Sequence, residues 1–166
     1  MNQQSHELTA AFLQAHHDLL AFVERCGAEH WQAICPDEGR SVGVLLHHVA
    51  IGYAVETDLI KAVATSQPIP AIYADWAEVD QFNAAHAERH HDCSKQETVA
   101  LLQQHAAVTL EYIRGLSEAQ LCRTTHVPIL TPWFGDAVSA RQLIEGLLPG
   151  HIQMHLAGMK AATGSA

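Results

Sequence analysis

The chain has 166 residues, a length that suits one domain with a sizeable hydrophobic core. Hydrophobic residues make up 48% and charged residues 16%, which is a globular composition and excludes a disordered chain. The net charge of −9 argues against nucleic-acid binding, because such binding needs basic side chains that neutralise phosphates.

The sequence carries no targeting signal that we recognise. No apolar stretch reaches the roughly 18 residues of a membrane span, and the opening MNQQSHELTA lacks the basic and apolar regions of a secretory signal. Dispersed thiols without a C-x-x-C pair are typically reduced and buried, and this is the pattern of Cys26, Cys35, Cys93 and Cys122. We therefore expect a cytoplasmic protein that binds neither nucleic acid nor a membrane.

Apolar residues recur at helical spacing along most of the chain, and no stretch alternates as a β-strand would. The first apolar stripe runs from Leu8 to Cys26, and Gly27 then supplies a helix stop. Ser41 is a good N-cap for a second helix that runs to about Ala64. The SQPIP stretch that follows breaks this helix and separates it from the next helical region.

The third helical region begins near Asp75 and runs to about His91. The capping-box pattern SKQE, residues 94–97, restarts the helix, and its apolar stripe continues from Val99 to Leu116. SEAQL predicts a short helical turn. The following stretch, which contains two prolines and a glycine, predicts a long loop over residues 122–138.

A second capping-box pattern, formed by Ser139 and Gln142, opens a last helix that ends near Ala162. Pro149 lies inside this region and predicts either a bend near that point or a helix that begins afresh there. Four principal helices with apolar stripes predict an all-α antiparallel four-helix bundle with a long loop before the last helix.

We assign residues 1–162 to a single bundle domain and residues 163–166 to a short C-terminal tail. Facing helices in a bundle of this kind can build a site in its interior.

Two adjacent histidines interrupt the apolar run SVGVLLHHVAIGY, residues 41–53. Neighbouring helical positions diverge by about 100°, so both rings cannot face the centre of the core. His48 shares a face with Leu45 and Gly52 and is predicted to point inward, whereas His47 falls on a row of smaller and more polar residues. A buried imidazole is costly without a partner.

His151 and His155 lie four residues apart on an apolar face of the last helix, where both rings can reach one cation. His48, on a facing helix, would complete a three-histidine site. Zinc sites that do chemistry commonly hold three protein ligands and leave a position for water or substrate, and imidazole also suits nickel, iron and copper. The alternative is a set of core histidines that bond to the backbone or to each other.

A second H-x-x-x-H pair shows that spacing alone carries little weight. With thirteen histidines in the chain, about one such pair is expected by chance. The sequence has two, because His86 and His90 also lie four residues apart. These two lie in the polar stretch FNAAHAERHHDC, so we expect them on a solvated face in preference to the entrance of the site or a second, weaker ion site. For Trp133, in the long loop, packing at the end of the bundle is favoured over covering the site.

The pattern of these segments resembles the DinB-like superfamily. RSVGVLLHHVAIGY is similar to its second helix, with His48 seven positions after the serine, and SARQLIEGLLPGHIQMHLAGM carries its last-helix H-x-x-x-H as His151 and His155. VDQFNAAHAE is similar to its third helix. The resemblance implies a four-helix bundle with one divalent ion, usually zinc or nickel, held by these three histidines, often in a homodimer.

Relatives implied by the same resemblance include mycothiol-dependent maleylpyruvate isomerase and bacillithiol transferases. We therefore expect metal-dependent chemistry on a small-molecule substrate, either thiol transfer with a low-molecular-weight thiol or hydrolysis. The alternative is a metal-containing binding or stress-response protein without turnover. A substrate-sized cavity with an open coordination position would favour the enzyme, and a closed ligand shell the binding role.

Other site classes fit the sequence less well. A metalloprotease needs H-E-x-x-H, but Ile152 stands where the glutamate base is required. A ferritin-like centre needs two Glu-x-x-His motifs, and Glu88 with His91 supplies one. Cys93 lies near two histidines but is favoured as a packing residue. Asp58 is a candidate outer partner of the metal ligands.

Overall fold

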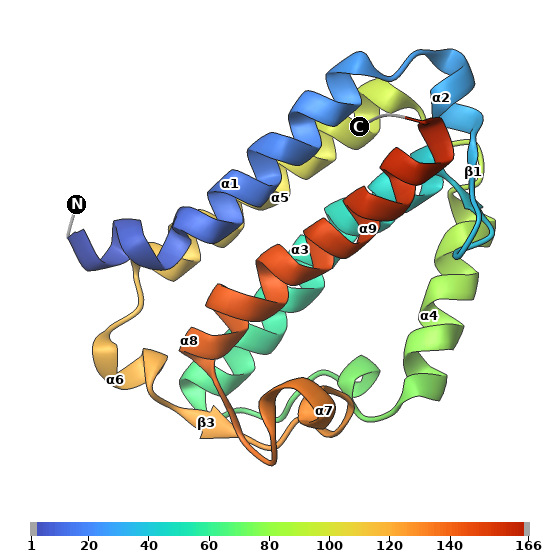
Figure 1. Cartoon of the computed structure of the whole chain (residues 1–166). Coiled ribbons are helices and arrows are strands. Elements are labelled where there is room, and N and C mark those ends of the chain that lie inside the picture. The colour runs from blue at the N-terminus through green and yellow to red at the C-terminus, as the bar shows by residue number, and fades with distance from the viewer. Residues whose placement is uncertain (1–2, 165–166) are drawn as a thin grey trace.

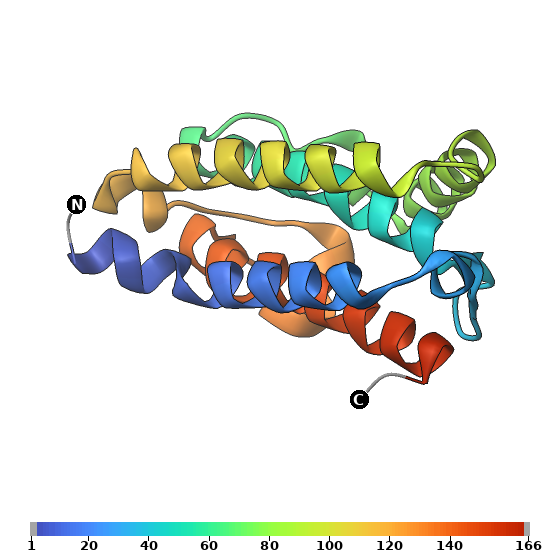
Figure 2. The same cartoon turned by 90° about the horizontal axis from the view of Figure 1, so that it is seen from above.

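The structure, a computed structural model, describes residues 3–164 and is a bundle of four long helices (Figures 1 and 2). α3 packs against both α5 and α9, and α1 packs against α9 and α5. The bundle is formed by α1 (Gln3–Arg25), α3 (Val42–Thr65), α5 (Lys95–Arg114) and α9 (Leu148–Thr163). The all-α four-helix bundle predicted from the sequence is confirmed.

The helix directions refine this architecture. α1 and α9 run one way and α3 and α5 run the other way, so these neighbouring pairs are parallel (Figure 1). This arrangement requires a return of the chain between α3 and α5. The short η1 (Ala71–Tyr73) and α4 (Trp76–Arg89) provide it, and α4 also packs against α3.

Side-chain caps set the helix boundaries close to the predicted positions. Ser41 Oγ accepts a hydrogen bond from the Val44 amide at 3.3 Å and begins α3. Asp75 and Ser94 cap α4 and α5 in the same way. Complete capping boxes begin α6 (Glu118–Leu121) and α8 (Ala140–Gln142). Each cap satisfies backbone amides that have no partner inside the helix.

Short strands are the main local difference from the sequence expectation. Two pairs of two-residue antiparallel strands are present, and runs this short leave no alternation to detect. The remaining short elements are α2 (Ala28–Gln32), β1 (Ile34–Cys35), β2 (Arg40–Ser41), β3 (Thr124–Thr125), η2 (Pro128–Leu130), α7 (Thr131–Phe134) and β4 (Val138–Ser139). The long loop before the last helix therefore contains local structure.

The last helix begins with α8 and passes through η3 (Leu143–Leu147), a π-helical turn, into α9. α9 begins at Leu148 with Pro149 in its first turn, where the missing N–H of proline is tolerated. This agrees with the expectation of a helix that begins afresh near Pro149, with the π-helical turn directly before it. α9 ends at Thr163, within the predicted tail, and Gly164 caps it at φ +64°. Residues 165–166 of that tail lie outside the described residues.

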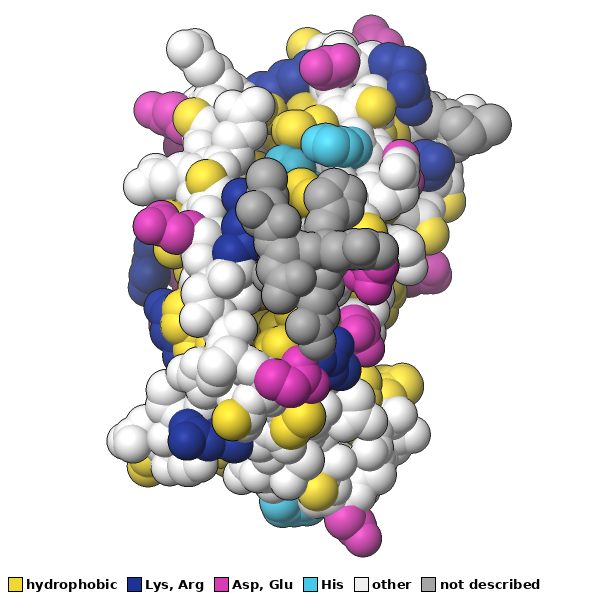
Figure 3. Space-filling model, turned by 90° about the vertical axis from the view of Figure 1, so that its left-hand side faces the viewer, with side chains coloured by type: hydrophobic (Ala, Val, Ile, Leu, Met, Phe, Trp, Pro, Cys, Tyr) yellow, Lys and Arg dark blue, Asp and Glu magenta, His cyan; other side chains and the backbone are white. Residues whose placement is uncertain are grey.

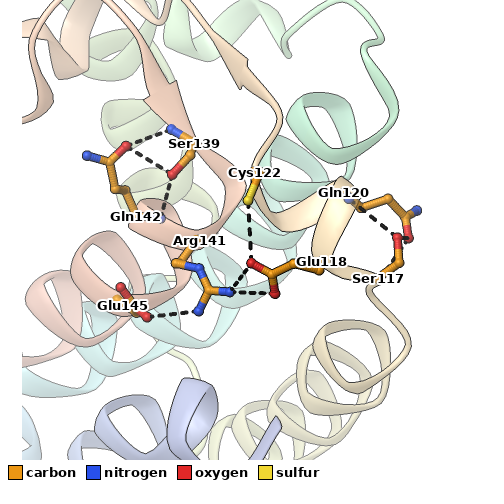
Figure 4. A network of polar contacts seen from close by, with 8 residues as sticks. All are labelled: Ser117, Glu118, Gln120, Cys122, Ser139, Arg141, Gln142 and Glu145. Atoms are coloured by element: carbon orange, nitrogen blue, oxygen red, sulfur yellow. Dashed lines mark hydrogen bonds and ion pairs between the residues drawn. The ribbon is translucent and has the colours of Figure 1, made fainter. Parts of the chain in front are cut away.

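A partly exposed ion-pair network anchors the start of this last helix (Figure 4). Arg141 Nη2 donates to both carboxylate oxygens of Glu118 at 2.9 Å, and its Nη1 lies 3.6 Å from Glu145 Oε1. The Cys122 thiol donates to Glu118 at 3.4 Å. Exposed pairs of this kind stabilise a fold by about 0–1 kcal/mol, so the network mainly sets the position of α8 relative to α6.

α3 is the central helix of the core. Eighteen of its residues are buried, including both histidines, because α5, α9 and α4 cover different sides of it. The core around α3 is filled by large side chains from the other helices, such as Phe12, Phe22 and Leu102. A helix that is covered on most sides has no broad solvent-exposed face. His47 is therefore buried, although it points away from His48.

Acidic and basic side chains are interspersed on the face shown in Figure 3. Among the helices of the described chain, none combines the length and apolar character needed to cross a membrane.

Candidate metal centre

α3 and α9 bring together the three histidines singled out by the sequence. One ring nitrogen from each of His48, His151 and His155 lies within 4.8 Å of the others. His48 Nε2 is 3.2 Å from His151 Nε2, and the ring of His155 is centred 5.0 Å from that of His48 and 4.6 Å from that of His151. Residues more than 100 positions apart therefore form one cluster in the bundle interior.

Two carboxylates contact the outer nitrogens of this cluster. Glu56 Oε1, from α3, lies 2.8 Å from His151 Nδ1. Glu38 Oε1, from the turn between β1 and β2, lies 2.8 Å from His155 Nδ1. A carboxylate at Nδ1 fixes the ring orientation and leaves Nε2 to face a metal, which is the usual outer arrangement of metal-binding histidines.

Sequence reasoning missed both carboxylates and considered Asp58 instead. Asp58 is exposed and pairs with Lys61 at 2.9 Å, away from the histidines. Glu56 lies eight positions after His48, about two helical turns away, and this spacing on a buried face is the signal that could have found it. Glu38 lies in a turn, and the periodicity of apolar residues does not predict where the side chains of a turn point.

The buried charge of Glu56 needs compensation. Its side chain is almost fully buried, and its Oε2 has no hydrogen-bond partner among residues 3–164. Burial raises the pKa of Glu56 above its ordinary value. Burial lowers the pKa of His151, but the carboxylates of Glu56 and Glu38 together outweigh this effect and raise it overall. The pair therefore retains a proton or, in its place, needs another cation.

His48 and His155 are held in their neutral forms. Burial, followed by the neighbouring histidines, lowers the pKa of His48 far below its ordinary value. Burial also lowers the pKa of His155, although the contact with Glu38 partly opposes it. The pKa of Glu38 falls to about 2, mainly through His155 and also through Arg40. Neutral imidazole is the form that ligates a metal.

The facing nitrogens give a direct test of whether a metal fits. His151 Nδ1 lies 2.8 Å from Glu56 Oε1, although this contact does not have hydrogen-bond geometry. If Nδ1 carries its proton toward this carboxylate, His151 presents its Nε2 lone pair to His48 Nε2, and two lone pairs repel unless a proton or a cation lies between them. If His48 donates that proton, its Nδ1 becomes a buried acceptor, and this atom has no hydrogen-bond partner within the described chain. Zn–N bonds of 2.0–2.1 Å place tetrahedral ligands about 3.3 Å apart. The observed 3.2 Å fits this geometry.

Gly52 makes room for the His151 ring. A Cβ at position 52 would lie 2.7 Å from His151 Cε1, closer than real Cβ contacts allow. Glu56, four residues later on the same helix, contacts Nδ1 of that ring at 2.8 Å, so a shift of the imidazole away from position 52 also moves it away from this carboxylate. Glycine at this position therefore positions a candidate ligand.

We expect Gly52→Ala to weaken zinc binding by about tenfold or more, an effect of the size seen when outer contacts of metal ligands are lost. Zinc titration against a competing chelator measures this change. Gly158→Ala is the matched control, because nothing lies within 4 Å of a Cβ there. Both substitutions favour the helix by about 1 kcal/mol, so equal zinc affinity in the two variants would contradict the role of Gly52.

The structure corrects the predicted positions of the other histidines. His47 and His86 are buried, at 9% and 5% exposure, and lie together with His90 in a second cluster. The expectation that His86 lies on a solvated face is wrong, because α4 packs against α3 and buries the ring between the two helices. The same packing buries His47, although it lies on a row of smaller and more polar residues.

Two other sequence candidates lie outside the metal cluster. Trp133 is 64% exposed, and its ring contacts the ring of Trp76 edge to face at 6.0 Å. Burial raises the pKa of the Cys93 thiol, which disfavours the reactive thiolate.

Access to the cluster is narrow. The His151 side chain is 15% exposed and the His155 side chain 4%. A hollow of about 660 Å³ between α1 and α5, lined by residues that include Leu20, Lys95 and Val99, does not include the three histidines. Solvent therefore reaches the cluster on the side of His151.

Comparisons with known proteins agree with this geometry. Residues 11–159, which include all three histidines of the cluster, match the DinB superfamily. One solved structure of similar fold is YfiT from Bacillus subtilis, described as a probable metal-dependent hydrolase with an unusual four-helix bundle topology; the TM-score is 0.70 at 15% identity, over 100% of this chain and 91% of that one. No curated protein matches. The chain belongs to the DinB superfamily.

Proposed function

We propose that the protein is a metal-dependent enzyme that acts on a small molecule, with one divalent ion held by His48, His151 and His155. The observation that carries the proposal is the buried set of three imidazoles, two of which contact carboxylates at Nδ1. Zinc and nickel are the proposed ions, since imidazole suits both. The description of YfiT as a probable metal-dependent hydrolase supports the same class of reaction.

A bound divalent ion would lower the pKa of a coordinated water or thiol and so supply a nucleophile near neutral pH. The side chains of the protein prepare that position. Glu56 and Glu38 hold the rings of His151 and His155 by their Nδ1 atoms, so that Nε2 faces inward. Arg40 pairs with Glu38 and holds that carboxylate against His155. The partly exposed side of His151 is the proposed entry for substrate.

We propose two reaction types for this site, hydrolysis and transfer of a low-molecular-weight thiol. The protein is stripped of metal with a chelator, reloaded with zinc or nickel, and assayed with small esters and amides and with thiols plus electrophiles. Turnover is expected in the reloaded protein and not in the metal-free protein or in His155→Ala. If loaded protein binds the ion but shows no turnover in any assay, the role without catalysis is favoured.

We also propose that the protein is a cytoplasmic homodimer, which rests on the family resemblance. Sedimentation velocity tests the dimer, and a single species with the mass of one chain would contradict it.

A further inference from the structure

A second histidine cluster lies between α3 and α4. One nitrogen from each of His47, His86 and His90 lies within 4.8 Å of the others. His47 Nδ1 is 2.9 Å from His86 Nε2, and the rings of His47 and His90 stack with centroids 4.0 Å apart. His86 and His90 are four residues apart on α4, so both rings project from the same face of that helix.

Hydrogen bonding inside the cluster does not account for its buried polar atoms. The contact between His47 and His86 uses one nitrogen of each ring. His86 is 5% exposed, and its Nδ1 is buried without a hydrogen-bond partner in the part of the chain that the structure describes. A buried ring nitrogen without a partner costs free energy. Apolar side chains could fill the same space without this cost, so packing alone does not explain three imidazoles here.

We propose that His47, His86 and His90 form a second metal site, which takes a divalent transition-metal ion such as zinc or nickel. Imidazole-only ligands favour these ions over magnesium and calcium, which require oxygen ligands. Tetrahedral ligand nitrogens lie about 3.3 Å apart, so the pair of His47 and His86 opens by a few tenths of an ångström to admit the ion. Three protein ligands leave a fourth position for water.

The second site lies next to the first. His47 and His48 are consecutive residues of α3, and the ring of His86 meets that of His48 edge to face at 5.6 Å. The surroundings of the two clusters differ in charge. Glu56 and Glu38 contact the first cluster. The positive charge of Arg40 acts on both clusters, and Arg89 adds a second positive charge near His86.

This difference in charge predicts that the two sites fill in order. Outer carboxylates strengthen metal affinity by about 10–100-fold, so the site of His47, His86 and His90 is expected to be weaker than the first by about that factor. The full-length protein, freed of metal and of any histidine tag, is titrated with zinc, and bound zinc per chain is measured by elemental analysis after equilibrium dialysis.

The wild-type protein is expected to bind two zinc ions per chain, the second at higher free zinc. His90→Gln should bind one, with the first affinity unchanged, and this variant is preferred because His90 is only partly buried. His91→Gln is the matched control and should bind two, since His91 is exposed and bonds to the backbone oxygen of Glu88. Circular dichroism checks that each variant is folded.

The outcomes separate this proposal from the proposed function. If the wild-type protein binds one zinc ion that His151→Ala loses and His90→Gln retains, the second site is overturned and the first stands. Equal zinc binding in His90→Gln and His91→Gln also overturns it. A single ion lost in His90→Gln and retained in His151→Ala would support this cluster and overturn the first.

Discussion

His151→Ala is expected to lose the tighter metal ion. The substitution removes one of three proposed ligands, and we expect zinc affinity at this site to fall by more than about 100-fold, beyond the effect of losing an outer contact. Zinc content after dialysis at low free zinc, where the weaker cluster stays empty, measures the loss. His91→Ala, which changes an exposed histidine, should retain the ion.

This variant also leaves Glu56 buried without its partner, and a buried charge in that state costs about 3–5 kcal/mol. Two further variants therefore separate metal loss from unfolding. His155→Ala removes a ligand whose carboxylate, Glu38, keeps Arg40 as a second partner. The double variant His151→Ala/Glu56→Gln removes both members of the buried pair. If the folded forms of these variants keep wild-type zinc affinity, the assignment of ligands is wrong.

The fold could be predicted largely because it depends on local signals. Apolar periodicity located the long helices, and Ser41, Asp75, Ser94 and Ser139 marked their beginnings. Helix direction was not available from the same signals, because caps and periodicity locate the ends of a helix and do not show which way it packs against its neighbours. The two-residue strands and the π-helical turn depend on tertiary packing and leave no pattern in the sequence.

The candidate site was predictable only in part, because periodicity describes one helix at a time. It placed His48, His151 and His155 on apolar faces, and the structure brings them together. It did not predict the burial of His47 and His86 because it assumed that α3 is covered on one face, whereas α3 is covered on several. Glu38 reaches His155 from a turn, and only the three-dimensional path of that turn shows the contact.

Glu56→Gln is expected to change metal affinity and metal-free stability in opposite directions. In the protein with metal, the variant loses the charge that orients His151 and offsets the ion, so zinc affinity should fall by about 10–100-fold. In the metal-free protein, the variant removes a buried carboxylate whose Oε2 has no hydrogen-bond partner in the described residues. The amide keeps an oxygen that can stay in contact with His151 Nδ1, as Oε1 does at 2.8 Å in the wild type.

The gain in metal-free stability should depend on pH. Burial raises the pKa of Glu56 in the folded state, so the wild-type protein loses stability as the pH rises above the ordinary pKa of a glutamate, near 4.5. Above pH 7, the metal-free variant should therefore exceed the wild type by about 1–3 kcal/mol in urea unfolding. Glu111→Gln, on the exposed side of α5, is the control and should change neither zinc affinity nor metal-free stability.

If Glu56→Gln weakens zinc binding but also destabilises the metal-free protein, Glu56 is mainly a structural partner of His151. The carboxylate would then have no specific role in holding the ion.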